Sequence, residues 1–452
     1  MAKTPVVKNQ ALTVKIEDLT YEGMGVAKVD GYPLFVDGAL PGEKVVAHIT
    51  KADRKYAFAR MNELLEASPD RVAPKAKAYA QTGIAPLQHL AYPAQLKFKQ
   101  QQVENLFQKA KLDIEVKPTL GMDQPFGYRN KAQIPVRMVN GQLTTGFYKR
   151  RSHELLPLED FYIQDPKIDQ AILVVRDLLR KYQIPAYNEA DNSGVIRHIV
   201  VRRGYFSHQL MIVLVTNTWA IDHLEDIVKG LTEALPELAS LMLNLNNRKT
   251  NVILGKKTRT LFGHDYLEDQ LLGSTFRISP LSFYQVNPQQ TEVLYQQAID
   301  AADLKGNETV IDAYSGIGTI SLSMAKHAKR VLGVEVVPEA VHDAKVNASL
   351  NSIKNAEFVV GKAEDVMTKW AEDGLHADVL MVDPPRKGLA PEFTAAVGKM
   401  LPDKVVYVSC NPATLARDIA ALQEFGYTAK SNQPVDMFPQ TTSIESVTVL
   451  TK

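Results

Sequence analysis

A single cysteine, Cys410, ends an apolar stretch and stands directly before Asn411-Pro412. The β-branched and aromatic run 405–408 predicts a buried strand, and the Asn-Pro pair interrupts it. We expect a helix to resume at about Thr414, with an N-cap type of residue at its start. Ligands in open α/β sheets bind beyond the carboxyl ends of the strands, so a thiol at such an end is a candidate nucleophile. The alternative is a small, buried apolar residue, which is the common role of a lone cysteine.

A thiol and a carboxylate at one sheet edge are the pair needed to methylate a pyrimidine at carbon-5. That carbon is a weak nucleophile, and addition of a thiolate to carbon-6 converts it into an enolate carbon that attacks an electrophilic methyl group. A base must then remove the carbon-5 proton so that the thiolate can be eliminated. Glu445, just before a predicted strand at 446–450, is the candidate base, and Cys410 is the candidate nucleophile.

A glycine-containing turn follows another predicted strand, 309–313. Residues 312–319 read DAYSGIGT, and the glycines allow a ligand to approach the backbone where a helix begins. The third glycine of the dinucleotide fingerprint is missing, which disfavours a pyrophosphate cofactor. Glu335 ends the next predicted strand, where a carboxylate can accept hydrogen bonds from both ribose hydroxyls. The pattern favours a nucleoside cofactor without phosphates, such as S-adenosylmethionine. An α/β domain without a nucleotide is the alternative.

A third candidate motif, Asp383-Pro384-Pro385-Arg386, follows the apolar strand predicted at 379–382. Two consecutive prolines fix an extended turn and remove two amide donors. Such a rigid wall, with Asp383 beside it, can shape a slot between a cofactor and a flat base. An ordinary exit from a strand into a loop is the alternative.

The elements that must position these residues alternate between strands and helices from about residue 280. Strands are expected at 309–313, 330–335, 357–360, 379–382, 405–408 and 446–450, with helices reaching Ala328 and covering 338–350. This alternation predicts a mainly parallel, doubly wound sheet within a multidomain α/β protein.

Two further domains are expected before this one. Residues 1–66 alternate with period two between Gly-containing turns, which predicts a small β-barrel of the oligonucleotide-binding type. Residues 67–279 are expected to hold a Pro/Ala-rich connector without periodicity, an amphipathic helix at 94–111, and a central α+β domain with helices at 168–182 and 220–235. Residues 280–452 then form the domain that carries the candidate site.

The composition is that of a globular protein: 45% of the 452 residues are hydrophobic, 23% are charged, and the formal net charge is +1. No apolar run is long enough to span a bilayer, and the first residues lack the features of a signal peptide. One cysteine excludes an intrachain disulfide and any all-cysteine zinc or iron–sulfur site. We expect a cytoplasmic monomer without a metal.

Positive charge is concentrated in two segments that contain no acidic residue. Residues 126–152 include Arg129, Lys131, Arg137, Lys149, Arg150 and Arg151, and residues 241–262 include Arg248, Lys249, Lys256, Lys257 and Arg259. In the predicted barrel, residues 51–60 also interleave cations with aromatic residues, as single-strand binders do. These segments predict an RNA-binding surface. Solvated strand and loop faces are the alternative for each segment.

Together these motifs resemble the RNA 5-methyluridine methyltransferase family, which methylates uracil in tRNA and 23S rRNA. The resemblance rests on the barrel, which is similar to a TRAM domain, and on SFYQVN (282–287), DAYSGIGT, DPPRKG, SCNPATLARD and DMFPQT with the following Ile-Glu. It implies a Rossmann-like catalytic domain in which Gln285, Tyr314, Glu335 and Asp383 bind S-adenosylmethionine, Cys410 is the nucleophile and Glu445 is the base. It also implies that the helix after the connector packs with the catalytic domain.

The sequence departs from the family pattern in two ways. Many members bind a [4Fe–4S] cluster through four cysteines, and the corresponding positions here are Ala76, Thr82, Ala85 and Phe161. Cluster-free members are similar to Gram-positive enzymes that act on 23S rRNA. The resemblance therefore implies that this protein acts on 23S rRNA and binds no iron–sulfur cluster. The family also often has a histidine two residues before the base, where this chain has Ser443.

The leading hypothesis from the sequence is uracil-5 methylation of 23S rRNA. Three alternatives stay open: a tRNA uracil-5 methyltransferase, an enzyme that methylates an exocyclic amine, and a non-catalytic rRNA-binding assembly factor. Methylation of an amine needs no thiol, and an assembly factor forms no covalent bond to RNA, so Cys410 separates both from the leading hypothesis.

Overall fold

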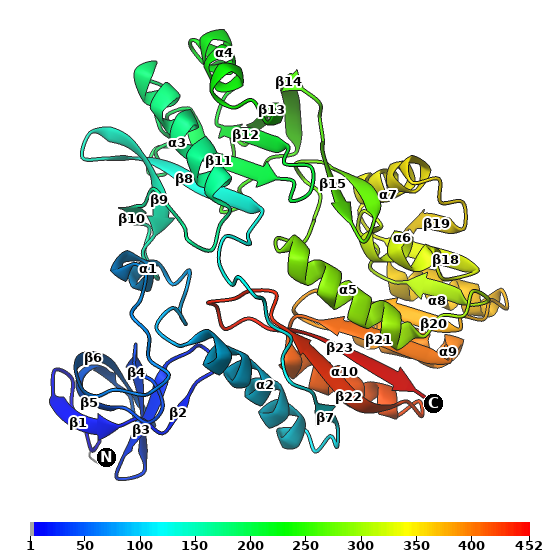
Figure 1. Cartoon of the computed structure of the whole chain (residues 1–452), viewed down its shortest axis with the longest axis horizontal. Helices are drawn as coiled ribbons and strands as arrows, with labels where there is room; N and C mark the ends of the chain where they lie inside the picture. Colours follow the sequence, from blue (N-terminus) through cyan, green and yellow to red (C-terminus); the bar gives the residue numbers. More distant parts are fainter. Residues whose placement is uncertain (1–3) are drawn as a thin grey trace. The chain divides into compact units, whose positions relative to one another are not determined.

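The computed structural model describes residues 4–452 and divides into two compact units. One unit comprises Met1–Gln102 with Phe438–Ser443, and the other comprises Val103–Met437 with Ile444–Lys452. Figure 1 shows the course of the chain through both. Each unit is described by itself.

The first unit contains a small six-stranded sheet. Its strands are β1 (Ala11–Lys15), β2 (Asp18–Leu19), β3 (Gly25–Val29), β4 (Tyr32–Asp37), β5 (Lys44–Ala52) and β6 (Ala57–Glu66). They lie in the order β1-β5-β6-β4-β3-β2, with antiparallel neighbours except for the parallel pair β4–β6. Alternate apolar side chains point inward, and Ile16, Leu34 and Ile49 are fully buried in the shared core. Gly31 and Gly38 have positive φ values at two of the turns that the sequence predicts.

The connector after this sheet contains a short helix of six residues, whereas the sequence predicted a segment without periodic structure. Helix α1 (Lys77–Thr82) ends at Gly83, which adopts the left-handed conformation. Six residues are too few to show a hydrophobic period, which explains why the sequence pattern missed it.

Helix α2 (Tyr92–Lys109) spans the division between the two units. In its first half, the buried Gln95 and Lys99 hold the segment Phe438–Ser443: Gln95 Oε1 accepts a bond from Gln440 N at 2.9 Å, and Lys99 Nζ donates to Phe438 O at 3.0 Å. In its second half, Val103 and Phe107 pack in one core with Ile311 and Tyr407 of the second unit.

The central part of the second unit is a seven-stranded sheet with two helices. Its elements are β8 (Lys131–Val139), β9 (Gln142–Tyr148), β10 (Leu155–Pro157), α3 (Pro166–Lys181), β11 (Ile196–Arg203), β12 (Leu210–Thr216), α4 (Leu224–Ala234), β13 (Leu238–Leu245) and β14 (Lys257–Gly263). The order is β10-β9-β8-β11-β12-β13-β14, and only β12–β13 is parallel. Helix α3 contacts β9, β11 and α4, and α4 contacts β13. Asp165 caps α3, so this helix begins two residues before the predicted start.

A hairpin of β15 (Leu267–Leu271) and β16 (Ser274–Ile278) joins this sheet to the catalytic part. It is held by helix α7 (Pro338–Leu350) and its C-cap residue: Asn347 Oδ1 accepts a bond from Arg277 N, and Asn351 Oδ1 accepts one from Thr275 N, both at 2.8 Å. The boundary at residue 279/280 stays a prediction.

The catalytic part is built on an eight-stranded sheet. Its strands are β7 (Glu115–Val116), β17 (Thr309–Asp312), β18 (Arg330–Glu335), β19 (Ala356–Val360), β20 (Val379–Val382), β21 (Lys404–Ser409), β22 (Thr428–Val435) and β23 (Glu445–Thr451). The order is β19-β18-β17-β20-β21-β23-β22-β7, in which β23 alone runs antiparallel to both neighbours. The mainly parallel sheet predicted from the sequence is confirmed.

Helices cover both faces of this sheet. They are α5 (Pro288–Ala302), α6 (Thr319–Ala325), α7 (Pro338–Leu350), α8 (Ala363–Glu372), α9 (Pro391–Met400) and α10 (Pro412–Gln423). The first three contact the sheet on one face (Figure 1). On the other face, Met367, Phe393 and Leu415 of α8, α9 and α10 share one core with Ile311 and Tyr407 of the strands. This two-faced cover is the doubly wound arrangement, which brings loops together at the carboxyl edge of the strands.

Candidate active site

Four of the predicted side chains, together with Asp312, meet at one edge of the catalytic sheet. Asp312 and Glu335 end β17 and β18, while Asp383 and Cys410 directly follow β20 and β21, and these four strands are parallel. Because β23 is antiparallel, its first residue, Glu445, lies at the same edge.

The strand register brings the candidate nucleophile and the candidate base together. Ser409 of β21 pairs with Ser446 of β23, so Cys410 and Glu445 are the next residues beyond this pair on the two strands. Glu445 is the first residue of β23, not the residue before the strand as the sequence pattern predicted. Its side chain is buried, and Cys410 is half-buried.

The segment after Cys410 forms a helix cap. Asn411 Oδ1 accepts a bond from Ala413 N at 3.1 Å, and α10 begins at Pro412 instead of near Thr414. Proline is favoured in the first helical position because its missing N–H is not needed there, so the Asn-Pro pair starts the helix as well as ending the strand. Cys410 therefore lies between the end of a strand and the N-terminus of a helix.

The Asp-Pro-Pro-Arg loop is tied to the same helix. Asn411 Nδ2 donates to Arg386 O at 2.9 Å, and Asp418 Oδ2 accepts from Leu389 N at 2.8 Å. Gly388 has a φ of +74°, and a Cβ there would lie 2.4 Å from Asp418 Oδ2, so only glycine fits this close approach. These contacts fix the loop that carries Asp383 relative to the segment that carries Cys410.

The edge is an acidic cluster with strongly perturbed pKa values. Burial, and then the charges of Glu445 and Asp383, raise the pKa of the Cys410 thiol to about 12. Burial and the charge of Asp383 raise the pKa of Glu445 well above its usual range, and burial and Asp312 raise that of Asp383 to about 7. Arg386 opposes the shifts at Cys410 and Glu445. The thiol is therefore protonated in the free protein, and these carboxyl groups hold protons unusually strongly.

The turn after β17 holds Glu335 in a fixed orientation. Glu335 Oε2 accepts a bond from Gly316 N at 3.1 Å, and its Oε1 accepts one from Val337 N at 2.9 Å. Gly316 has a φ of +52°, and a Cβ there would meet no atom within 4 Å, so the turn faces open space. Val336 and Val337 beside the carboxylate are exposed, which leaves an apolar surface next to it.

Gln285 reaches this region from a loop, not from a strand end. Its buried side chain hydrogen-bonds the Tyr295 hydroxyl, which also lies 3.3 Å from Thr319 Oγ1 at the start of α6. Asp383 is the strongest charge acting on Tyr295 and raises its pKa further after burial. Gln285 and Asp383 therefore both lie close to Tyr295.

Tyr314 lies in the turn after β17 and is half-buried. Its ring packs against Phe393 of α9 with ring centroids 5.6 Å apart. Burial raises its pKa, with smaller contributions from Glu364 and Asp418. The structure thus brings all six predicted residues to one edge of the sheet, at strand ends or in the adjoining turns and loops.

The sequence analysis did not single out Tyr295, Asp312 and Arg386 as site residues. Asp312 and Arg386 stand within quoted motifs, and the position of Asp312 at the end of a strand was a usable signal. Tyr295 is inside α5, where a buried aromatic residue has no feature that distinguishes it from ordinary core.

Two family models match the chain: residues 91–452 match tRNA (uracil-5-)-methyltransferase, and residues 5–61 match the TRAM domain. The chain belongs to the tRNA (uracil-5-)-methyltransferase family. Membership makes the protein an S-adenosylmethionine-dependent RNA uracil-5 methyltransferase with an N-terminal TRAM domain. The family resemblance predicted from the motifs is confirmed.

Relatives of this methyltransferase cover its whole length. An uncharacterized RNA methyltransferase of Lactiplantibacillus plantarum is 58% identical, over 99% of this chain and 98% of its own, and one of Enterococcus faecalis is 54% identical, over 100% and 99%. The structure of Pyrococcus abyssi tRNA (uracil-54, C5)-methyltransferase in complex with S-adenosyl-L-homocysteine matches with a TM-score of 0.78 at 24% identity, over 97% of this chain and 100% of that one. This structural likeness shows a shared fold.

The edge of the methyltransferase sheet fits S-adenosylmethionine. Asp312 Oδ1 and Ser315 Oγ are buried in the turn and have no hydrogen-bond partner among residues 4–452, so each is available to a polar group of a ligand. The fixed Glu335 carboxylate suits two ribose hydroxyls, and the exposed Val336 and Val337 suit the flat face of a purine.

The four positions that the sequence analysis matched to cluster cysteines differ in their burial. Ala85 and Phe161 are buried, and Thr82 Oγ1 donates to Tyr79 O at 2.9 Å within α1. Ala76 is the N-cap of that helix. None of these four side chains is a thiol.

Ser443 stands where the family often has a histidine. Its backbone N–H donates to Thr441 Oγ1 at 3.3 Å.

The first basic segment is less cationic in three dimensions than in sequence. Lys149 forms an ion pair with Glu154, and Arg137 forms one with Glu189. A count of charged residues within 126–152 missed Glu154 and Glu189, because both carboxylates lie outside this segment.

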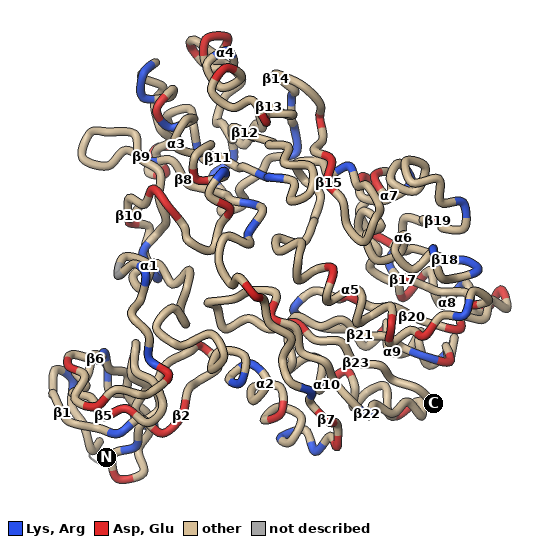
Figure 2. The backbone as a smooth tube through the Cα atoms, in the orientation of Figure 1, with Lys and Arg blue, Asp and Glu red and all other residues tan. Residues whose placement is uncertain are grey.

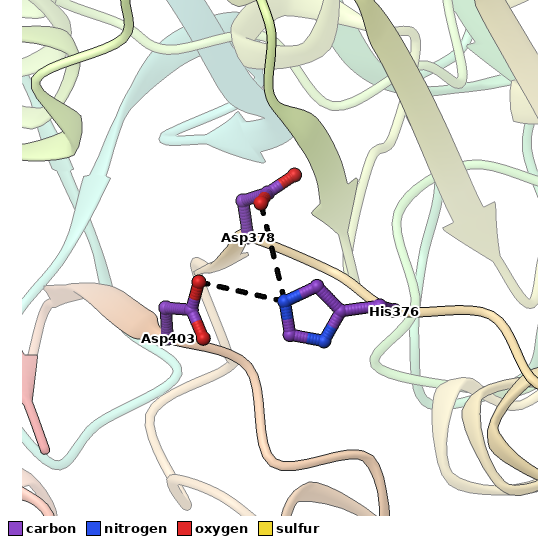
Figure 3. Close-up of side chains that lie close together, drawn as sticks. All are labelled: His376, Asp378 and Asp403. Atoms are coloured by element: carbon purple, nitrogen blue, oxygen red, sulfur yellow. Dashed lines mark hydrogen bonds and ion pairs between the residues drawn. The ribbon is translucent and has the colours of Figure 1, made fainter.

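A further group of possible metal ligands lies at the opposite edge of the methyltransferase sheet (Figure 3). His376 Nε2 is 3.4 Å from Asp403 Oδ2 and 3.9 Å from Asp378 Oδ1. Asp378 Oδ2 accepts a bond from Thr309 N at 2.7 Å. His376 and Asp403 are exposed, and we interpret the group as a surface ion pair. No helix in the part of the chain that the structure describes is long and apolar enough to cross a membrane.

Proposed function

We propose that this enzyme methylates carbon-5 of one or more uridines in 23S rRNA, with Cys410 as nucleophile and Glu445 as base. The observation that carries the catalytic assignment is the β21–β23 register, in which Cys410 directly follows Ser409 and Glu445 directly precedes its partner Ser446. A thiol and a carboxyl group on adjacent strands can reach carbon-6 and carbon-5 of one flat ring.

The reaction begins with loss of the Cys410 proton to a neighbouring carboxylate. The thiolate Sγ then bonds to carbon-6 of uracil, and the electrons of the carbon-5–carbon-6 double bond move toward the carbonyl group to give an enolate. S-adenosylmethionine would supply the methyl group: carbon-5 would bond to it as its bond to the sulfonium sulfur breaks, and S-adenosylhomocysteine would be the leaving group. Glu445 removes the carbon-5 proton, the double bond forms again, and Sγ leaves as thiolate.

The raised pKa values fit a site that is completed by its substrates. A positively charged sulfonium placed among Asp312, Asp383 and Glu445 favours the ionised forms of these groups, because opposite charges stabilise each other in a buried site. Gln285, Tyr314, Glu335 and Asp383 hold S-adenosylmethionine in this proposal, and Asp312 adds a polar contact.

The rRNA assignment is supported by the resemblance to cluster-free Gram-positive enzymes that act on 23S rRNA. A tRNA substrate is the second candidate, because the archaeal protein of similar fold is a tRNA (uracil-54, C5)-methyltransferase. We propose a monomer that acts in the cytoplasm.

The deciding experiment maps 5-methyluridine by mass spectrometry in 23S rRNA and tRNA from a strain that lacks the gene and from its parent. Loss of the nucleoside from 23S rRNA alone, restored by the wild-type gene, supports the proposal. Loss from tRNA alone would replace it by the second candidate. Restoration by the gene for Cys410→Ala would contradict the nucleophile assignment.

A further inference from the structure

The second basic segment includes a loop, residues 246–256, that joins β13 to β14 in the central sheet. Lys and Arg recur along β14 and the chain that leads into it (Figure 2). Three buried polar residues hold this loop in one shape: Asn244, Asn246 and Arg197 are at most 4% exposed. An exposed connection does not need such support for stability alone, because water can satisfy its backbone.

The two asparagines hold the second half of the loop. Asn246 Nδ2 donates to Val252 O at 2.7 Å and to Ile253 O at 3.0 Å. Asn244 Nδ2 donates to Gly255 O at 2.8 Å, and its Oδ1 accepts from Gly255 N at 2.7 Å. A Cβ on Gly255 would lie 1.8 Å from Leu245 O, so the chain returns too close to itself for any other residue.

Arg197 of β11 holds the first half. Its guanidinium donates to the carbonyl oxygens of Asn246, Arg248 and Thr250 at 2.9–3.3 Å, and it lies over the Tyr187 ring at 4.0 Å. Its charge is used inside the protein and is not available to a ligand. Its role is to fix the backbone of the loop.

The shaped loop borders a cationic hollow of about 430 Å³. Its lining includes Arg248, Lys256 and Lys257 with the polar Asn247 and Thr250, and no acidic residue. The three cations are exposed, and none of them forms an ion pair within residues 4–452. Cations without carboxylate partners around a hollow of nucleotide size favour a phosphate-bearing ligand.

We propose that the hollow is a second RNA contact, which binds the phosphate of a substrate nucleotide other than the methylated uridine. This proposal extends the proposed function and depends on it in one respect only, namely that the substrate is RNA. The hollow lies on the central sheet, apart from the strand ends that carry Cys410 and Glu445. Contacts made there act before the chemical step, so they lower KM for RNA without changing kcat.

The test compares Arg248→Ala/Lys256→Ala/Lys257→Ala with the charge-matched control Lys229→Ala/Lys354→Ala/Lys369→Ala, whose lysines are exposed elsewhere. Tritiated methyl transfer is measured against total RNA from a strain lacking the gene. We expect KM for RNA to rise about tenfold at ~150 mM salt in the first variant, with kcat within about twofold of wild type. The dependence of log KM on log salt concentration should lose about 0.7 for each phosphate contact removed. Equal KM values and equal salt slopes in the two variants would overturn the proposal.

A second variant separates the shape of the loop from its charge. Asn246→Ala keeps every cation and removes two of the bonds that hold the loop. We expect KM for RNA to rise severalfold with kcat retained, and an unchanged KM would contradict a pre-formed site. Filter binding of the same RNA provides a readout that does not need turnover. If the wild type transfers no methyl group, the proposed function fails, while a difference in binding between the variant and its control still supports this contact.

Discussion

Cys410 and Glu445 lie next to one register pair, Ser409–Ser446, of two antiparallel neighbouring strands: Cys410 directly follows Ser409, and Glu445 directly precedes Ser446. The antiparallel direction of β23 is what makes this possible, since a parallel strand would bring its carboxyl end to this edge instead. The proposed base thus lies at the start of one strand, and the proposed nucleophile lies directly after the end of its neighbour.

Replacement of the thiol separates uracil-5 methylation from methylation of an amine. Cys410→Ala should lower methyl transfer by at least about 10⁴-fold, because no other group can add to carbon-6. Cys410→Ser is expected to retain trace activity at most. Turnover is measured with tritiated S-adenosylmethionine, and binding of S-adenosyl-L-homocysteine by calorimetry provides the control for folding. Activity of Cys410→Ala near the wild-type level would exclude the thiol mechanism.

Replacement of the base should trap the reaction after methyl transfer. Glu445→Gln keeps the size of the buried side chain but accepts no proton, so kcat should fall by about 10²–10⁴-fold. Methylated RNA should remain bonded to the protein and migrate with it on a denaturing gel. A fall in kcat without this complex would mean that Glu445 acts before the covalent step.

The perturbed thiol and carboxyl groups predict a rate that increases with pH. Since the pKa of Cys410 is raised to about 12 and that of Asp383 to about 7 in the free protein, the reactive ionisation state is scarce at low pH. We expect kcat/KM for RNA to rise up to about tenfold per pH unit between pH 6 and 8. A profile that is flat over this range would show that proton loss from these groups does not limit the reaction.

Asp383 should reduce the stability of the free protein above neutral pH. Its pKa is raised to about 7 in the folded state, so between pH ~4 and 7 the folded chain binds a proton that the unfolded chain has released. Stability from this group therefore falls as pH rises through that window and stays reduced above it. Asp383→Asn should raise Tm by about 1–1.5 °C per kcal/mol gained at pH 8, with a smaller gain at pH 5. Equal shifts at both values would argue against a buried carboxylate as the cause.

The catalytic strands could be predicted closely because they are short apolar runs between turn signals. The predicted ranges 330–335 and 379–382 coincide with β18 and β20, and the residues at their ends were correctly assigned to one edge. The alternation of strands and helices along the sequence was enough to predict the doubly wound sheet. The position of Cys410 at the end of β21 followed from the same pattern.

The start of α10 was a local signal that was misinterpreted. The Asn411-Pro412 pair was interpreted as a break, although Asn at the N-cap and Pro in the first turn are typical of a helix start. Other features depend on contacts that no local pattern contains. Gln285 reaches the site through Tyr295, and Lys149 is neutralised by Glu154 beyond its own basic segment. Each of these two gaps concerns a partner chosen by the tertiary fold.

The central claim is a covalent bond between Cys410 and carbon-6 of a uridine. Total RNA from a strain lacking the gene, made with 5-fluorouridine, is incubated with the enzyme and S-adenosylmethionine, and the denatured complex is digested and sequenced by mass spectrometry. Fluorine at carbon-5 blocks the final elimination, so the account predicts a peptide containing Cys410 that carries a methylated fluorouridine nucleotide. A nucleotide attached to another residue, or methylated RNA without any adduct, would contradict it.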